Sequence, residues 1–290
     1  MFNAPEIFID TSYVAYFNIF ATWKWYTREY IYDDDDYRLD GTFDPITDKE
    51  FECMLEYKFR SSINDVIFSL INSVDKSKVY FACDCIKRDI WRNEYYDLYK
   101  RQRYDKKQPF NLSGSFSFLM NRLIPIECEN NKHKMISVKN AEADDIIGHI
   151  VINNKKENFI ITNDRDLAQL DKYAKIYNLL KDNINIKNVY KKEKVDDIIK
   201  NNNTGDFILY KALKGDNSDN ITGFLPRTGP KTASKYISNK SLLKDICNKN
   251  KEAYDALKRN IKIMDLTKIP DCIKKDIWNE WENCQQGDSD

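Results

Sequence analysis

The sequence Phe159-Ile160-Ile161-Thr162-Asn163-Asp164-Arg165-Asp166 consists of a short apolar run followed directly by two acids. Such a run is typical of a buried strand. Helical periodicity covers about Lys49–Val74 and Ala141–Asn153. Strands that alternate with helices predict an α/β fold with a mostly parallel sheet. Three more runs have the same strand-like character: Ile7–Ile9, Val79–Ala82 and Ala174–Tyr177.

The strand pattern stops near residue 192, which predicts two regions. We expect an α/β core over residues 1–192 and a helical region over residues 193–290. Residues 24–48 contain the run Asp33–Asp36 and are predicted to be a solvated insertion. Residues 86–122 form a long, charged and aromatic-rich connection, and connections of this length are usually functional.

The composition excludes several classes of function. The 290 residues include 46 Lys+Arg and 46 Asp+Glu, so a uniformly basic surface for polyanions is excluded. Nucleic-acid contacts must come from local segments such as 87–107, which has eight basic and four acidic residues. No apolar run approaches the ~20 residues of a membrane span, and the first ten residues do not resemble a signal peptide, so we expect an intracellular protein. Seven cysteines without a CxxC motif, and only two histidines, predict free thiols rather than a disulfide framework or a zinc site.

Acidic residues follow the predicted strands. Asp10 follows the first strand, Asp84 the second, and Asp164 the run that begins at Phe159. In parallel sheets the carboxyl ends of the strands meet at one edge, where ligands bind. Each acid alone is also explained by a turn or a helix N-cap. Together, however, clustered carboxylates repel one another and need cations. Further acids complete the set: Glu142, Asp144, Asp145, Asp166, Asp216 and Asp219.

This set offers oxygen ligands, which hard cations prefer. We therefore expect Mg²⁺, with Mn²⁺ able to substitute, and two ions arranged for in-line attack on a phosphodiester. The turn Thr228–Ala233, which reads Thr-Gly-Pro-Lys-Thr-Ala, opens a predicted helix whose backbone N–H groups could meet a phosphate. The same turn also suits an ordinary connection between helices.

These motifs occur in the order typical of the 5′-nuclease superfamily, the flap endonucleases and the 5′–3′ exonuclease domains of bacterial DNA polymerases. The chain resembles this family over about residues 5–280. It is most similar to the RNase H branch of T-even phages, through Trp91-Arg92, the segment 99–103 (Tyr-Lys-Arg-Gln-Arg) and the segment 260–270. The resemblance implies a PIN-like core with a helical arch at about 86–122, and a helix–three-turn–helix element in the C-terminal region. It implies Mg²⁺-dependent hydrolysis of DNA, or of RNA in RNA·DNA hybrids, at 5′ ends and flaps.

The resemblance also assigns roles to residues. Lys100 and Arg103 would contact the scissile phosphate and stabilise the charge of the transition state. The first metal group would be Asp10, Asp84, Glu142, Asp144 and Asp145, of which Asp10 and Asp84 also count as catalytic. The second group would be Asp164, Asp166, Asp216 and Asp219. The nucleic-acid-binding candidates are Arg88, Arg92, Lys100, Arg103, Gly229, Lys231 and Thr232.

Two features leave alternatives open. The aromatic residues Trp91, Tyr95, Tyr96 and Tyr99 would either stack on unpaired bases or pack the segment onto the core. The turn at residues 223–231 is one residue longer than the family pattern and lacks one glycine. The K⁺ ion and the duplex that this turn would bind are therefore less firmly implied than the acidic site.

The leading hypothesis is a 5′ nuclease that removes RNA primers or flaps by two-metal hydrolysis. A PIN-type ribonuclease for single-stranded RNA would not need the helical C-terminal region or the basic segment. A DNA-binding scaffold without activity is disfavoured because all the motif acids are present, and a small-molecule phosphatase is disfavoured by the basic segment. We expect a monomer without membrane contact, in the cytoplasm of a bacterium or of a virus-infected cell. Its expected partners are DNA with 5′ flaps, nicks or RNA primers, and a replicative polymerase or single-strand-binding protein.

Overall fold

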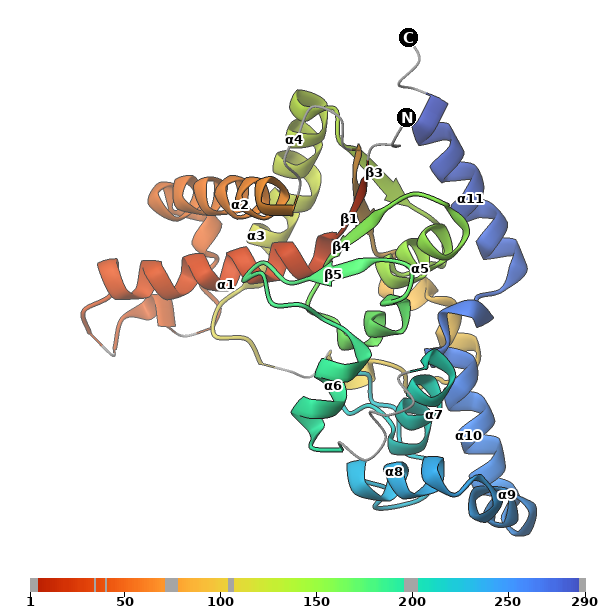
Figure 1. Cartoon of the computed structure of the whole chain (residues 1–290). Helices are drawn as coiled ribbons and strands as arrows, with labels where there is room; N and C mark the ends of the chain where they lie inside the picture. Colours follow the sequence, from red (N-terminus) through yellow and green to blue (C-terminus); the bar gives the residue numbers. More distant parts are fainter. Residues whose placement is uncertain are drawn as a thin grey trace.

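A five-stranded parallel sheet forms the centre of the computed structural model, which describes residues 5–33, 35–39, 41–70, 78–103, 107–195 and 203–286. The strand order is β3-β2-β1-β4-β5 (Figure 1). The α/β prediction and its PIN-like variant are confirmed. The strands are β1 (Glu6–Asp10), β2 (Lys78–Cys83), β3 (Lys134–Ser137), β4 (Asn158–Ile161) and β5 (Lys175–Tyr177).

Both faces of the sheet are buried, and the side chains of each strand alternate between the two faces. Ile7 and Ile9 of β1 belong to one hydrophobic cluster, and Phe8 belongs to the other. The first face is covered by α1 (Thr11–Tyr30), α2 (Lys49–Leu70), α3 (Leu112–Phe118) and α4 (Ile124–Asn131) (Figure 1). On the second face α5 (Ala143–Asn153) packs against the sheet, and its hydrophobic cluster continues into the C-terminal helices.

The C-terminal region is helical, as predicted. No strand is described beyond Tyr177. Helices α7 and α8 flank the loop of residues 215–229 and contact each other, in the place expected for the helix–three-turn–helix element. None of the described helices is both long and apolar enough to span a membrane. The C-terminal helices are α6 (Ile186–Glu193), α7 (Thr204–Lys214), α8 (Pro230–Ser238), α9 (Lys240–Lys249), α10 (Lys251–Met264) and α11 (Asp271–Gln286).

Residues 24–30 continue helix α1 instead of forming a solvated insertion. Tyr26 is fully buried and lies edge-on to Phe51 of α2. Aromatic packing between α1 and α2 therefore continues the helix into the segment predicted to be an insertion. Of the acidic run Asp33–Asp36, Asp34 lies outside the described residues, and Asp36 pairs with Arg38 at 2.6 Å.

The segment 86–122 also differs from the expected helical arch. Its described residues before 104 form three 3₁₀ turns, Lys87–Asp89, Trp91–Glu94 and Arg101–Arg103, and residues 104–106 lie outside the described part. After the gap, Phe110 is buried with its ring 4.3 Å from that of Trp23. The end of the segment therefore belongs to the helical layer of α1 and α2.

Candidate active site

Two acids at the carboxyl edge of the sheet lie beside the start of α5. Asp10 ends β1 and caps α1 by accepting a 3.0 Å hydrogen bond from the backbone N–H of Tyr13. Thr162, which follows β4, donates to the other Asp10 oxygen at 2.8 Å. Asp84 follows β2 and accepts a 2.8 Å hydrogen bond from the backbone N–H of Ala143, the first residue of α5. The fold thus brings three distant segments together, as the strand-end pattern predicts.

The start of α5 supplies the densest group of carboxylates. Glu142, Asp144 and Asp145 each offer one oxygen, and these atoms lie within 4.8 Å of one another. Asp145 closes a capping box by accepting from the Glu142 backbone N–H at 3.0 Å. The Oδ1 atom of Asp144 is buried and has no hydrogen-bond partner among the described residues. An unpaired buried oxygen in such a group is a ready ligand for a cation.

Arg92 is the internal counter-ion of this group. Its guanidinium donates to Glu142 at 2.7 Å, to both Asp145 oxygens at 2.8 Å, and to Asp144 at 3.3 Å. Its Nε–H donates to the carbonyl of Ile263 in α10 at 2.8 Å. The side chain is only 2% exposed. The expectation that Arg92 binds nucleic acid is therefore corrected, because its donors are used inside the protein.

The second group of acids depends on a buried lysine. Lys211 in α7 lies 2.6 Å from both Asp166 and Asp216, and its side chain is 8% exposed. Asp164 caps the turn that carries Asp166 by accepting its backbone N–H at 2.8 Å. Lys211 was not among the site residues predicted from the sequence. The available signal was a lysine on the apolar face of the helix that directly precedes the acidic loop.

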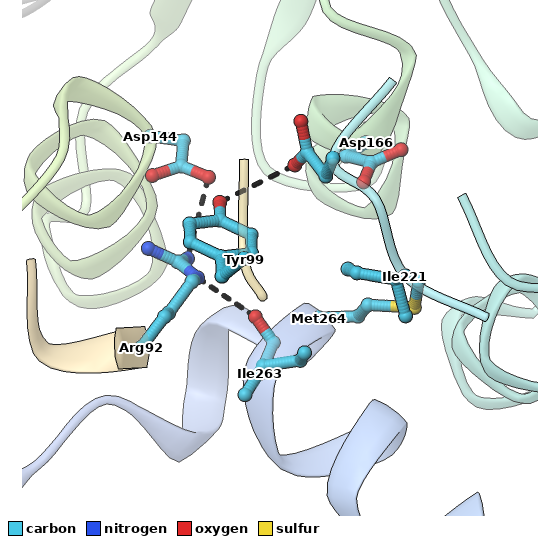
Figure 2. Close-up of a pocket in the computed structure, with 8 residues that line it drawn as sticks. Arg92, Tyr99, Asp144, Asp166, Ile221, Ile263 and Met264 are labelled. Carbon is cyan, nitrogen blue, oxygen red and sulfur yellow. Dashed lines mark hydrogen bonds and ion pairs between the residues drawn. The ribbon is translucent and has the colours of Figure 1, made fainter. Parts of the chain in front are cut away.

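Tyr99 and Lys100 join the two groups. The Tyr99 hydroxyl lies 2.9 Å from Glu142 and 3.3 Å from Asp219 (Figure 2 shows Tyr99, Asp144 and Asp166 around the pocket). The Lys100 ammonium lies 2.5 Å from Glu142 and 3.8 Å from Asp219. Arg103 pairs with Asp219 at 2.6 Å. Both predicted phosphate-contacting cations are thus at the acids.

The aromatic residues of this segment mostly favour the packing alternative. Trp91, Tyr96 and Tyr99 are buried, and Trp91 donates its indole N–H to Asp145 at 2.9 Å. Tyr95 is 46% exposed and is the one member of this set with an accessible ring.

A small cavity of about 10 Å³ separates the two acid groups (Figure 2). A volume of roughly 10–15 Å³ holds about one water molecule. Since Lys100 and Arg103 pair with Glu142 and Asp219, a bound phosphate would require both cations to exchange carboxylate oxygens for phosphate oxygens. The lining residues are Arg92, Tyr99, Asp144, Asp166, Asp219, Ile221, Ile263 and Met264.

The electrostatics of the acids fit a divalent cation. Burial, followed by repulsion from Asp84, raises the pKa of Asp10 to about 6. Burial, followed by repulsion from Asp166 and Asp219, raises the pKa of Asp164 to about 7. Bound cations would offset this repulsion, and an all-oxygen donor set suits Mg²⁺ or Mn²⁺. Although burial opposes it, Lys211 holds the pKa of Asp216 down at about 2.

The remaining nucleic-acid candidates are at the start of α8 and in the turn that follows β2. Gly229 caps the start of α8 with open space around its Cα, and Lys231 is exposed next to it. Thr232 lies in the first turn of α8 and is partly buried, and the side chain of Arg88 is 81% exposed. In the preceding turn Arg227 adopts a left-handed φ of 63°, a conformation that glycine adopts more easily.

Comparison with known proteins gives a consistent result. The profile of the family described as 5′–3′ exonuclease, N-terminal resolvase-like domain, matches residues 55–200. A 5′–3′ exonuclease of Mycoplasmopsis pulmonis is 29% identical over 217 residues, which cover 71% of this chain and 67% of the relative. One from Buchnera aphidicola subsp. Schizaphis graminum is 30% identical over 213 residues, with the same two coverages.

Solved structures share the fold. A T5 protein co-crystallised with metal ions has a TM-score of 0.62 at 17% identity, over 95% of this chain and 98% of that chain. A bacteriophage T5 flap endonuclease in complex with DNA and metal ions has a TM-score of 0.60 at 16% identity, over 97% and 99% of the two chains.

Proposed function

The chain belongs to the 5′–3′ exonuclease family and is a nuclease, and from this premise we propose a Mg²⁺-dependent, structure-specific 5′–3′ exonuclease and flap endonuclease. Its substrates are DNA, or RNA paired with DNA, at 5′ ends and flaps. The observation that carries the proposal is the meeting of two carboxylate groups with Lys100 and Arg103 at one edge of the sheet. A solved T5 flap endonuclease with this fold was crystallised with DNA and metal ions, which supports the choice of substrate and cofactor.

The acids divide into two ligand groups in this proposal. The open Asp144 oxygen supports a cation among Asp10, Asp84, Glu142, Asp144 and Asp145. The high pKa of Asp164 supports a second cation among Asp164, Asp166, Asp216 and Asp219. When bound, divalent cations lower the pKa of water and offset negative charge on the phosphate oxygens.

The side chains of the protein orient the substrate and the acids. Lys100 and Arg103 turn from their carboxylate partners to the scissile phosphate and stabilise the charge that develops on it. Tyr99 lies between Glu142 and Asp219, and its single hydroxyl hydrogen is shared between them, with the shorter contact to Glu142. Lys211 holds Asp166 and Asp216 together, while Arg92 fixes the acids of α5 from behind. Once Lys100 and Arg103 have turned to the bound phosphate, their charge needs no further rearrangement in the chemical step, and such charge is a large catalytic contribution.

The helical region supplies duplex binding in this proposal. The start of α8, with Gly229, Lys231 and Thr232, presents backbone N–H groups to the phosphate backbone, next to a K⁺ site in the turn of residues 223–231. The left-handed Arg227 in that turn supports a backbone path like that of a glycine-containing loop. We assign residues 1–192 to the catalytic core and 193–290 to duplex binding.

The partners and setting follow from the substrate. DNA polymerase I proteins are among the similar sequences, and one from Bacillus caldotenax is 34% identical over 151 residues. This supports a nuclease that acts beside a replicative polymerase or a single-strand-binding protein. We propose that it acts as a monomer inside the cell, where such DNA is processed.

The test is cleavage of a labelled 5′-flap duplex in Mg²⁺, beside an EDTA control, a single-stranded DNA and a single-stranded RNA. Metal-dependent cutting at the flap junction supports the proposal. Binding without cutting would overturn it in favour of a scaffold, and cutting of single-stranded RNA alone would overturn it in favour of a PIN-type ribonuclease.

A further inference from the structure

The loop between α7 and the turn before α8 carries two acids of the second group. Residues Asp216 and Ile221 exchange two backbone hydrogen bonds of 2.8 and 2.7 Å, which close the loop. Gly215 enters the loop with a φ of 79°, and a Cβ there would lie 2.4 Å from the Ile221 carbonyl oxygen. The loop has a defined shape, and the position of its base decides where Asp216 and Asp219 point.

Asn260 of α10 holds both sides of that base. Its side chain is fully buried, and its amide nitrogen donates to the carbonyls of Ala212 at 2.9 Å and Thr222 at 2.7 Å. Ala212 precedes the loop in α7, and Thr222 follows it. The Asn260 carbonyl oxygen accepts from Arg259 at 3.1 and 2.9 Å, so the amide uses both donor hydrogens and both lone pairs.

The opposite side of the loop contacts the segment that carries the phosphate-binding cations. The backbone N–H of Lys100 donates to the Asp219 carbonyl at 2.9 Å, and Asn220 donates its side-chain amide to the Leu98 carbonyl at 2.8 Å. The Gln102 side chain donates to the carbonyls of residues 217 and 218. A displacement of the loop base would therefore reach Lys100 as well as the acids.

We infer that Asn260 is a positioning residue for the second acid group, an inference that rests on the proposed function. It touches no substrate and no acid. It fixes the two ends of the loop, so that Asp216 and Asp219 stay beside Asp164 and Asp166. Lys211 links Asp216 to Asp166 above the loop base, and Asn260 fixes the base on which this ion pair depends.

The role predicts a specific loss of metal affinity. Substitutions behind metal ligands typically cost 10–100-fold in affinity or activity. For Asn260→Ala we expect the dissociation constant of one Mn²⁺ site, that of the second acid group, to rise about 10-fold, with the other site unchanged. In flap cleavage, the Mg²⁺ concentration for half-maximal rate rises and kcat falls, while KM for the flap duplex is unchanged.

Asn158→Ala is the matched control. Asn158 is also a buried asparagine whose amide nitrogen makes two hydrogen bonds, to Asn154 at 2.7 Å and to the Tyr173 carbonyl at 3.3 Å. It lies at the start of β4, at the sheet edge opposite the acids. It should lower thermal stability without changing Mn²⁺ affinity or the Mg²⁺ dependence.

The experiment measures Mn²⁺ binding by calorimetry for wild type, Asn260→Ala, Asn260→Asp and the control, followed by flap kinetics. Asn260→Asp keeps the volume and the Arg259 contact but removes both donors, so it supplies the measurement if the alanine variant does not fold. A loss of affinity confined to one of the two sites supports the inference, and variants that bind Mn²⁺ like the control overturn it. A wild type that binds Mn²⁺ but cuts no flap refutes the proposed function alone, because the Mn²⁺ comparison still decides the role of Asn260.

Discussion

Replacing Arg92 by methionine should destabilise the protein strongly. The guanidinium makes four hydrogen bonds to three carboxylates and one to the Ile263 carbonyl, and methionine supplies none of them. Removal of one partner from a buried ion pair costs about 3–5 kcal/mol. This is a large part of the roughly 5–15 kcal/mol that stabilises a typical domain. For a large domain each kcal/mol lowers the Tm by about 2–4 °C, so we expect a loss of roughly 6–20 °C at pH 8.

The pH dependence separates lost charge from lost packing. Burial and mutual repulsion raise the pKa values of Asp144 and Asp145, and the charge of Arg92 lowers them. Without Arg92 both pKa values therefore rise further in the folded state. A carboxyl group whose folded pKa is raised binds more protons in the folded state, so the variant recovers stability as the pH falls through that pKa. The difference in Tm between wild type and variant should therefore shrink from pH 8 to pH 5.5.

The assay is thermal unfolding followed by circular dichroism in EDTA at several pH values. Arg28→Met is the control, because Arg28 forms an exposed pair with Glu29 and its side chain is 77% exposed. Exposed pairs contribute about 0–1 kcal/mol, so this variant should unfold like wild type. A Tm for Arg92→Met within 2 °C of the control at pH 8, or a deficit that is equal at both pH values, would refute the reasoning.

Three further outcomes are expected. Lys100→Ala should lower the rate of flap cleavage by about 10²–10³-fold, because the loss of one group that stabilises the transition state costs this much, and Mn²⁺ should still bind. Equal rates for variant and wild type in a single-turnover assay would remove Lys100 from the mechanism. Arg227→Gly should raise the free energy of unfolding by about 1 kcal/mol, because glycine adopts the left-handed φ of 63° without strain; denaturant titration checks this, and an unchanged midpoint would contradict it. Burial lowers the pKa of His133 to about 4, so the unfolded chain binds more protons than the folded chain between roughly pH 6.5 and 4. The free energy of unfolding therefore decreases as the pH is lowered through that range. His133→Gln should lose less stability than wild type between pH 7 and pH 5, as denaturant midpoints at the two pH values would reveal.

The sequence predicted those features that depend on residue type alone, such as buried strands and the acids that follow them. Four apolar runs became strands, and the acids that follow three of them lie at the carboxyl edge of the sheet. The strand Lys134–Ser137 was missed because it lies at an edge of the sheet, and Ile136 is its one fully buried side chain. A pattern of apolar residues cannot detect a strand that is mostly half-exposed.

Partners distant in sequence were not predictable. Arg92 looked like a surface cation in a basic segment, yet its acids lie 50 to 53 residues away and its carbonyl partner 171 residues away. Lys211 likewise depends on how α7 packs beside the turn that carries Asp166. Charge alone does not distinguish an internal counter-ion from a ligand-binding cation, because tertiary packing decides which one is buried.

The anchor between Arg92 and Ile263 has a consequence for protein synthesis. Domains generally fold from the N-terminus as the chain leaves the ribosome. Here the acids near residue 142 emerge long before α10. Arg92, their counter-ion, therefore lacks the hydrogen bond to the Ile263 carbonyl until α10 has been made. Asp10 and Asp219 likewise lie at the beginning and near the end of the proposed ligand set. A chain synthesised only as far as α7 therefore lacks Asp216 and Asp219 of the proposed ligand set, so the set is completed only when the loop after α7 has been made.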